Sequence, residues 1–215
     1  MNVTVLCSDP NHPVVPYLKK LPNILGQQHV VQLVHQKEDV KGGDVLFLVS
    51  CSELIREHER SRYTACLVLH ASDLPNGRGW SPHIWEISQG AAFFTLSLIE
   101  AVDQLDAGPI WKKVQVQIPK HALWDEINAL LFQAELDLIE YAVQHFKTIQ
   151  PVEQTNTEGA TYYSRRTPQH SKIDPIKSLA EQFDLIRVCD PNRFPAFFEY
   201  QGFKYSLRLE KIDEL

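Results

Sequence analysis

One run of residues limits the fold more than any other. Asp44 to Ser50 reads DVLFLVS and has almost no polar face. Such a near-continuous apolar strand is typical of a parallel sheet that other elements cover on both sides. Val3 to Cys7, His29 to His35 and Ala65 to Leu69 are similarly apolar and predict three more strands. The sequence therefore predicts an α/β fold with a mostly parallel sheet.

Further strands and helices are expected up to about residue 150. Ala92 to Ile99 and Ile110 to Gln117 predict two more strands. Leu123 to Thr148 is the clearest helix, because its apolar residues recur at helical spacing. Shorter helical stretches are expected over Val14 to Leu25, Ser52 to Arg62 and Pro82 to Ser88.

The composition changes after Pro151, where the run VEQTNTEGAT is polar and typical of a linker. Beyond it we expect a helix over Ile176 to Cys189, with Leu179 on its apolar face. A β-hairpin over Ala196 to Ile212 should turn at Gln201-Gly202. The chain is thus predicted to form an α/β core over residues 1–150. A linker and a small C-terminal α+β appendage ending in a hairpin would occupy residues 151–215.

Charge and cysteine content help to exclude some classes of protein, such as nonspecific nucleic-acid binders. The 215 residues include 27 acidic and 21 basic side chains, a net charge of −6, which disfavours nonspecific binding to nucleic acid. The most apolar stretch, Ile87 to Ile99, is too short and too polar to span a membrane. The four cysteines are widely spaced and form no CxxC pair. We therefore expect a cytoplasmic protein with reduced thiols and no metal site.

Two ionisable residues occupy positions where active sites form in α/β proteins. His70 ends the predicted strand that begins at Ala65, and an irregular loop follows it. Asp106 lies in a loop between the last two predicted strands. A histidine beside a carboxylate can act as a base. Spacing alone leaves the alternative that both residues are structural.

The surrounding motifs carry a resemblance to a known family. The run LHASDLPNGRGWSP followed by LDAGPI resembles the formyltransferases that use 10-formyltetrahydrofolate. YYSRRTPQHSKID, from Tyr162 to Asp174, is similar to a segment of the branch that formylates nucleotide-linked amino sugars. The resemblance covers nearly the whole chain and implies a Rossmann-like catalytic core over residues 1–150.

The resemblance implies that His70 and Asp106 are catalytic. In the family, an amine attacks the formyl carbon, and the histidine and an asparagine donate hydrogen bonds to the resulting oxyanion. The aspartate orients the histidine and helps to remove the proton from the amine. The family asparagine position is Val68 in this chain, which cannot donate. Ser72, Asn76 or a backbone N–H could replace that donor.

The resemblance also implies a folate site in two loops. One follows the third strand, and the other holds Asp106. Ser52 before Glu53 reads equally as an ordinary helix cap, and both interpretations can hold. The residues expected to hold the folate are Ser50, Cys51, Ser52, Leu54, Ile55, Asp103 and Leu105.

The residues expected to bind the acceptor are less closely grouped. Asn11 and His12 follow the first strand, where relatives hold the acceptor's phosphate, although an ordinary Asx-Pro turn would also explain them. Arg78, Trp80 and Trp85 suit a sugar–nucleotide pocket through charge and ring stacking.

These observations favour an N-formyltransferase that acts on a nucleotide-linked deoxyamino sugar for surface glycan synthesis. Three alternatives stay open: a methionyl-tRNA formyltransferase-like enzyme, a formyltetrahydrofolate hydrolase and a catalytically silent homologue. The net charge of −6 argues against the tRNA enzyme, and Val68 is the feature that favours a silent one. The aromatic hairpin could pack on its own domain or form a homodimer.

Overall fold

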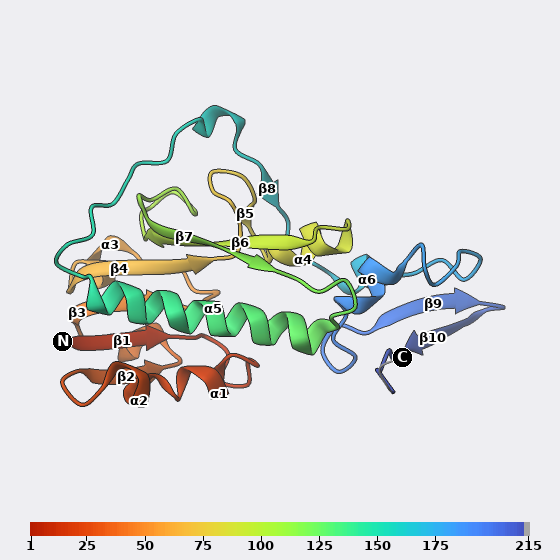
Figure 1. Cartoon of the computed structure of the whole chain (residues 1–215), viewed down its shortest axis with the longest axis horizontal. Coiled ribbons are helices and arrows are strands. Elements are labelled where there is room, and N and C mark those ends of the chain that lie inside the picture. Colours follow the sequence, from red (N-terminus) through yellow and green to blue (C-terminus); the bar gives the residue numbers. More distant parts are fainter. Residues whose placement is uncertain (213–215) are drawn as a thin grey trace.

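The computed structural model describes residues 1–212 and contains a six-stranded sheet in the order β2-β1-β3-β4-β6-β7 (Figure 1). The first four strands in that order are mutually parallel, whereas β6 and β7 run antiparallel to their neighbours. The predicted α/β class with a mostly parallel sheet is thereby confirmed. The strands are β1 (Asn2–Leu6), β2 (Val30–Val34), β3 (Gly43–Leu48), β4 (Tyr63–His70), β6 (Phe93–Glu100) and β7 (Ile110–Gln117).

The main core lies between the sheet and the long helix α5 (Trp124–Gln144), which runs across one face of the sheet (Figure 1). Glu126 helps to begin α5, because its carboxylate accepts the Leu123 N–H at 2.8 Å. Leu67 and Leu69 of β4 belong to this core. A smaller cluster, which includes Leu46, Leu48 and Cys66, covers the opposite face. Successive strand residues point to opposite faces, so Val68 and His70 belong to the face of the smaller cluster.

The other helical segments are short. Pro22 explains why the helix expected over Val14 to Leu25 is two helices, since proline has no N–H to continue the first one. The stretch expected over Ser52 to Arg62 is reduced to one turn, and the helix expected over Pro82 to Ser88 forms with those bounds. The segments are α1 (Val15–Leu18), α2 (Leu21–Leu25), η1 (Lys37–Asp39), α3 (Glu57–Arg60), α4 (Pro82–Ser88), η2 (Thr157–Gly159), η3 (Pro168–Ser171) and α6 (Phe183–Arg187).

The helix expected over Ile176 to Cys189 is largely wrong, because only α6 is helical there. The side-chain amide of Gln182 donates to the Lys177 and Ser178 carbonyl oxygens at 3.4 and 3.3 Å, which takes the place of helical main-chain bonds there. It accepts the Asp174 N–H at 2.6 Å and donates to the Asp174 oxygen at 3.0 Å, which holds the preceding residues in turns. Leu179, expected on the apolar face, is 62% exposed.

Two small sheets complete the fold. β9 (Ala196–Tyr200) and β10 (Phe203–Leu207) form the predicted hairpin, which extends from one end of the molecule (Figure 1). Its turn residues Gln201 and Gly202 both have positive φ, as a type I′ turn requires. β5 (Arg78–Gly79) and β8 (Tyr162–Tyr163) pair in parallel, which the sequence did not indicate. Within residues 1–212, no helix has the length and apolar character needed to cross a bilayer.

The β5–β8 pair brings the segment after α5 back to the body of the protein. That segment leaves the end of α5 and arcs over β6 and β7 to reach β5 (Figure 1). Gly79 is required at the crossing, because a Cβ there would collide with the Tyr163 carbonyl oxygen. The division of the chain at about residue 150 remains a prediction, and residues on both sides of it pack together here.

Candidate active site

His70 is the last residue of β4, and its ring lies between two oxygen acceptors. Nε2 is 2.8 Å from the Gly77 carbonyl oxygen, and Nδ1 is 3.6 Å from Oδ1 of Asp106. A carbonyl oxygen only accepts, so Nε2 carries the proton in the contact with Gly77. Nδ1 is therefore the ring atom that faces the Asp106 carboxylate. Only 8% of each side chain is exposed, so this contact is shielded from bulk water.

Asp106 belongs to the loop between β6 and β7, residues 101–109, which we name the aspartate loop. The loop begins beside the middle of β4, where the Ala101 N–H donates to the Cys66 oxygen at 2.8 Å. Asp106 has a φ of +51°, a left-handed conformation that aspartate tolerates better than most residues. Its Oδ2 accepts the Gly79 N–H at 2.8 Å. The carboxylate is thus fixed between β5 and the His70 ring.

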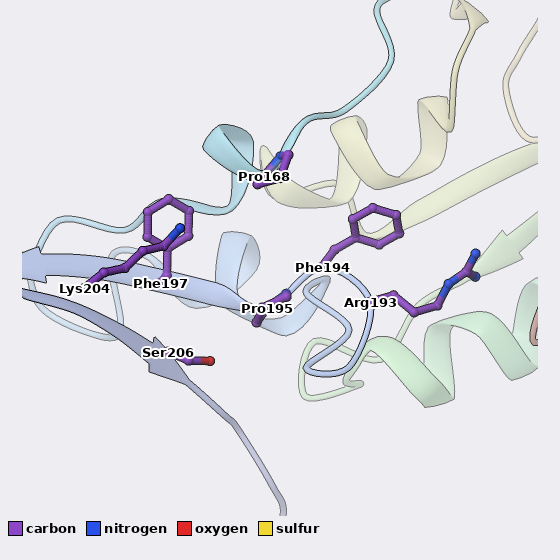
Figure 2. Close-up of a pocket in the computed structure, with 7 residues that line it drawn as sticks. All are labelled: Pro168, Arg193, Phe194, Pro195, Phe197, Lys204 and Ser206. Atoms are coloured by element: carbon purple, nitrogen blue, oxygen red, sulfur yellow. The ribbon is translucent and has the colours of Figure 1, made fainter.

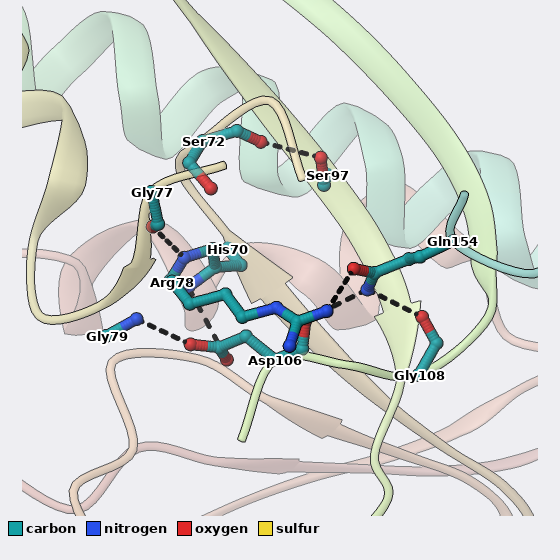
Figure 3. A network of polar contacts seen from close by, with 9 residues as sticks. All are labelled: His70, Ser72, Gly77, Arg78, Gly79, Ser97, Asp106, Gly108 and Gln154. Atoms are coloured by element: carbon teal, nitrogen blue, oxygen red, sulfur yellow. Dashed lines mark hydrogen bonds and ion pairs between the residues drawn. The ribbon is translucent and has the colours of Figure 1, made fainter. Parts of the chain in front are cut away.

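A polar network behind Asp106 includes Gln154, which sequence reasoning missed (Figure 3). Gln154 Nε2 donates to the main-chain oxygens of Asp106 and Gly108, both at 2.9 Å. Arg78 Nη2 donates to Gln154 Oε1 at 2.8 Å, and Arg78 Nη1 donates to the Tyr162 hydroxyl at 3.1 Å. Gln154 lies in the polar run after Pro151, where no local pattern distinguishes it from a linker residue.

The positions around the missing asparagine differ in their access to the site. Val68 is half-buried on the same face of β4 as His70 and pairs with Leu48 and Ile99. Ser72 is completely buried, and its hydroxyl has no hydrogen-bond partner within the described residues. Asn76 is exposed. Burial therefore removes Ser72 from contact with a bound molecule in this conformation.

His83 is a second histidine near the site. Burial, with smaller contributions from the neighbouring His70 and Arg166, lowers the pKa of His83 from 6.5 to about 3. Its ring packs against Phe94 with a centroid separation of 5.8 Å. His83 is therefore neutral at physiological pH and adds no charge beside His70.

The residues expected to hold folate fall on two loops, as predicted, but with different exposures. Leu54 and Leu105 are 58% and 56% exposed, whereas Ile55 is buried in the smaller cluster. Ser50 and Ser52 are exposed. Cys51 is half-buried, and Ser8 donates to its sulfur at 3.3 Å. Asp103 binds Arg60 at 2.6 Å.

The residues expected to bind the acceptor do not form one cluster. Arg78 is 1% exposed and lies in the network with Gln154. Trp85 donates to the Ser164 oxygen at 3.1 Å and stacks on Tyr163, so residues of the C-terminal part cover it. Trp80 is 40% exposed, with the Arg165 guanidinium 5.0 Å from its ring centroid.

Asn11 and His12 follow β1, where an Asx turn forms: the Asn11 N–H donates to Asp9 at 2.9 Å. His12 Nδ1 accepts the Val14 N–H at 3.2 Å. Burial lowers the pKa of His12 to about 4, and the nearby Arg193 guanidinium contributes in the same direction. The ring is therefore neutral at pH 7, and its Nε2–H is the donor that remains for a ligand.

The hollows on the surface of residues 1–212 include the following two. One, of about 370 Å³, borders the aspartate loop and is lined by Arg78, Gln104, Ala107, Glu153, Gln154, Thr157, Glu158, Ala160 and Tyr162. The other, of about 310 Å³, lies between η3 and the hairpin (Figure 2). Its lining residues, which include neither His70 nor Asp106, are Pro168, Arg193, Phe194, Pro195, Phe197, Lys204 and Ser206. Among residues 1–212, no cluster of His, Cys, Asp and Glu side chains could hold a metal ion.

Two sequence relatives of this chain carry the same name. No family model matches the chain. Methionyl-tRNA formyltransferase from Lachnospira eligens is 30% identical over 166 residues, which cover 73% of this chain and 50% of the relative. The enzyme of the same name from Protochlamydia amoebophila is 28% identical over 150 residues, or 69% of this chain and 47% of the relative. The chain thus spans about half the length of the curated relatives that it matches.

Solved structures match almost the whole chain. Methionyl-tRNA formyltransferase from Clostridium thermocellum superposes with a TM-score of 0.80 at 22% identity, covering 95% of this chain and 90% of that one. A 4-N formyltransferase from Francisella tularensis gives 0.75 at 17% identity, covering 98% of both. HypX from Aquifex aeolicus in complex with tetrahydrofolic acid gives 0.71 at 16% identity, covering 94% of this chain and 36% of HypX. The chain therefore has the fold of these three proteins, two of which are formyltransferases, and resembles methionyl-tRNA formyltransferases in sequence over about half of their length.

Proposed function

We propose that the chain is an N-formyltransferase that moves the formyl group of 10-formyltetrahydrofolate to the amino group of a nucleotide-linked deoxyamino sugar, a precursor of surface glycans. The observation that carries this proposal is the buried contact between His70 and Asp106 at 3.6 Å. Formyl transfer to an amine needs a group that accepts a proton from nitrogen, and a paired histidine and carboxylate provide one.

In this proposal, His70 and Asp106 are the catalytic residues. An ammonium group is not a nucleophile, so the attacking nitrogen must lose a proton before or during attack. Because Gly77 occupies Nε2 of His70, Nδ1 and the facing carboxylate are the atoms that receive and hold this proton. The Gly79 N–H fixes the second carboxylate oxygen, so Asp106 meets the ring in one orientation.

The exposed residues of the two predicted folate loops fit a pterin. Leu54 and Leu105 present apolar side chains that suit the face of a flat ring. Ser50 and Ser52 are exposed beside Leu54, with main-chain groups that suit the polar edge of such a ring. When bound, the folate supplies the formyl group. Asp103 would then lie at the rim of the site, held by Arg60.

The proposed sugar acceptor is supported by the 4-N formyltransferase fold and by polar and aromatic groups around β1 and α4. His12 offers a neutral N–H donor, Asn11 lies beside it, and Trp80 offers an exposed ring face. These are the kinds of group that bind phosphate and stack on a sugar or base.

Methionyl-tRNA is the second candidate acceptor, because both sequence relatives carry that name. Against it stands the net charge of −6, since proteins that bind tRNA use basic surfaces to contact its phosphates. Both candidates require the same chemistry at His70 and Asp106 and differ in what surrounds the amine.

One experiment tests the donor and the acceptor together. The purified protein is incubated with 10-formyltetrahydrofolate and, in separate reactions, with UDP-, dTDP- and GDP-linked amino sugars or with methionyl-tRNA. Mass spectrometry then detects the added formyl group, and His70→Ala is the inactive control. We expect formylation of one class of nucleotide sugar. Formylation of methionyl-tRNA alone would assign the second candidate, and release of free formate with every acceptor would indicate a hydrolase.

A further inference from the structure

Gln154 connects the C-terminal part of the chain to the aspartate loop. Its side-chain nitrogen donates to the main-chain oxygens of Asp106 and Gly108, both at 2.9 Å (Figure 3). One amide group thus holds two carbonyls of the loop that carries the Asp106 carboxylate. Gln154 is itself half-buried and lines the hollow beside this loop.

The part of the loop that Gln154 holds has little freedom. Asp106 is in the left-handed region, with a φ of +51°, so its side-chain direction depends on a backbone conformation that must be held in place. On the far side, a Cβ at Gly108 would collide with the Glu100 carbonyl oxygen. The loop is therefore packed against β6 on one side and bonded to Gln154 on the other.

Arg78 determines which way the Gln154 amide points. A guanidinium can only donate, so the amide oxygen must face Arg78 Nη2, at 2.8 Å, and the amide nitrogen must face the loop. Arg78 is 1% exposed, and none of the ion pairs found within residues 1–212 includes it. Its charge is met by neutral oxygens of Gln154 and Tyr162, which makes the bond to Gln154 charge-assisted.

We propose that Gln154 is a positioning residue that sets the Asp106 carboxylate against His70, with Arg78 fixing its orientation. This proposal rests on the proposed function of the His70–Asp106 pair. It makes the polar segment after α5 part of the active site rather than a linker. Gln154 itself contacts no reacting atom and acts only through the main chain of the aspartate loop.

Gln154→Glu is the sharpest test. The carboxylate has the shape of the amide and still accepts from Arg78, but it places an oxygen where two carbonyls now receive an N–H. We expect kcat to fall by about 10- to 100-fold, because small displacements of a catalytic group have effects of that size. KM for both substrates should change by less than about 3-fold, since Gln154 holds the catalytic loop and not the substrates. Gln117→Glu, on the exposed edge of β7, makes the same chemical change as a control.

A second measurement needs no substrate. The ring ¹⁵N chemical shifts of His70, identified by their loss in His70→Gln, report the environment of Nδ1 and Nε2. We expect them to change in Gln154→Glu and in the uncharged, similarly sized Gln154→Met, and to stay unchanged in Gln117→Glu. If neither Gln154 variant alters them, or if kcat falls only in proportion to the fraction unfolded, the positioning role is wrong.

The two measurements separate this inference from the proposed function. If the wild-type protein formylates no acceptor, the proposed function fails, whereas the His70 shifts still test whether Gln154 positions Asp106. If the wild-type protein is active and Gln154→Glu keeps both its kcat and its His70 shifts, only the inference about Gln154 is overturned.

Discussion

His70 Nδ1 lies 3.6 Å from Asp106 Oδ1, and each side chain is only 8% exposed. The two residues come from different elements, the end of β4 and the β6–β7 loop. Gly77 holds the far side of the imidazole, and Gly79 holds the far side of the carboxylate. Main-chain atoms of one short segment thus bond both groups, so the loop after β4 contributes to the geometry of the pair.

His70→Ala should lower the rate of formyl transfer by about 10²- to 10⁴-fold, the usual effect of a general acid or base. The protein should stay folded, because the ring bonds a single main-chain oxygen and the core cluster behind β4 does not include it. Steady-state assays and circular dichroism measure the two effects. The exposed His121→Ala is the control, and turnover near the wild-type level would remove His70 from the site.

Asp106→Asn should keep folate binding and lose turnover to a similar extent. Asparagine tolerates the left-handed backbone at this position and can still accept the Gly79 N–H. It cannot take a proton from His70 or from the amine. Folate binding, followed by fluorescence, and transfer assays separate the two properties, with the exposed Asp137→Asn as control. Weaker folate binding with normal turnover would make Asp106 a binding residue.

The helices and strands with a clear pattern of apolar residues could be predicted from the sequence. The apolar run of β3 and the helical stripe of α5 fix their type over several residues, so both form as expected. The pair β5–β8 could not be predicted, because two-residue strands have no period and depend on a contact between distant segments. The helix expected over Ile176 to Cys189 failed in its first part, where the Gln182 side chain donates to the Lys177 and Ser178 carbonyl oxygens that a helix would otherwise pair.

The candidate site likewise contains some residues that the sequence predicts and others that only the fold reveals. His70 and Asp106 stand in recognisable motifs, and the structure brings them together. Arg78 stands in the same motif, yet its side chain turns inward to Gln154, because burial and partner choice depend on the tertiary fold. Gln154 lies in a polar stretch without any local signal, so only the fold shows its contacts.

Glu135→Met should stabilise the protein increasingly as the pH rises. Glu135 lies in α5, is 4% exposed, and its Oε2 has no hydrogen-bond partner within the described residues. Burial raises the pKa of Glu135 from 4.5 to about 8. The folded state therefore binds the Glu135 proton more tightly than the unfolded state does. This proton contributes its full share to the free energy of unfolding of the wild-type protein below pH 4.5. That contribution is lost as the pH rises from 4.5 to about 8.

Glu135→Met has no ionisable group at this position, so its stability does not fall with pH for this reason. Its free energy of unfolding, relative to wild type, should rise with pH by an amount on the order of 4 kcal/mol. Urea titrations at several pH values between about 4 and 9 measure the difference, whatever constant offset the substitution introduces. Asp137→Asn, on the exposed side of α5, should show no such rise. A difference that stays constant with pH would mean that Glu135 is ionised in the folded protein.

Val68→Asn tests whether the missing oxyanion donor has been replaced. Val68 is half-buried between Leu48 and Ile99, so an amide there loses contact with water and should lower stability by about 1–3 kcal/mol. We expect little gain in kcat, because the contact between His70 and Asp106 is kept and the proposed reaction then requires that another group donate to the oxyanion. Ser72 is too deeply buried for this role, which leaves the exposed Asn76 or a main-chain N–H. Ser72→Ala and Asn76→Ala are assayed alongside Val68→Asn to test these two side chains as donors. A rise in kcat of up to about a hundredfold in Val68→Asn, with both alanine variants unchanged, would show that the oxyanion site is incomplete in this chain.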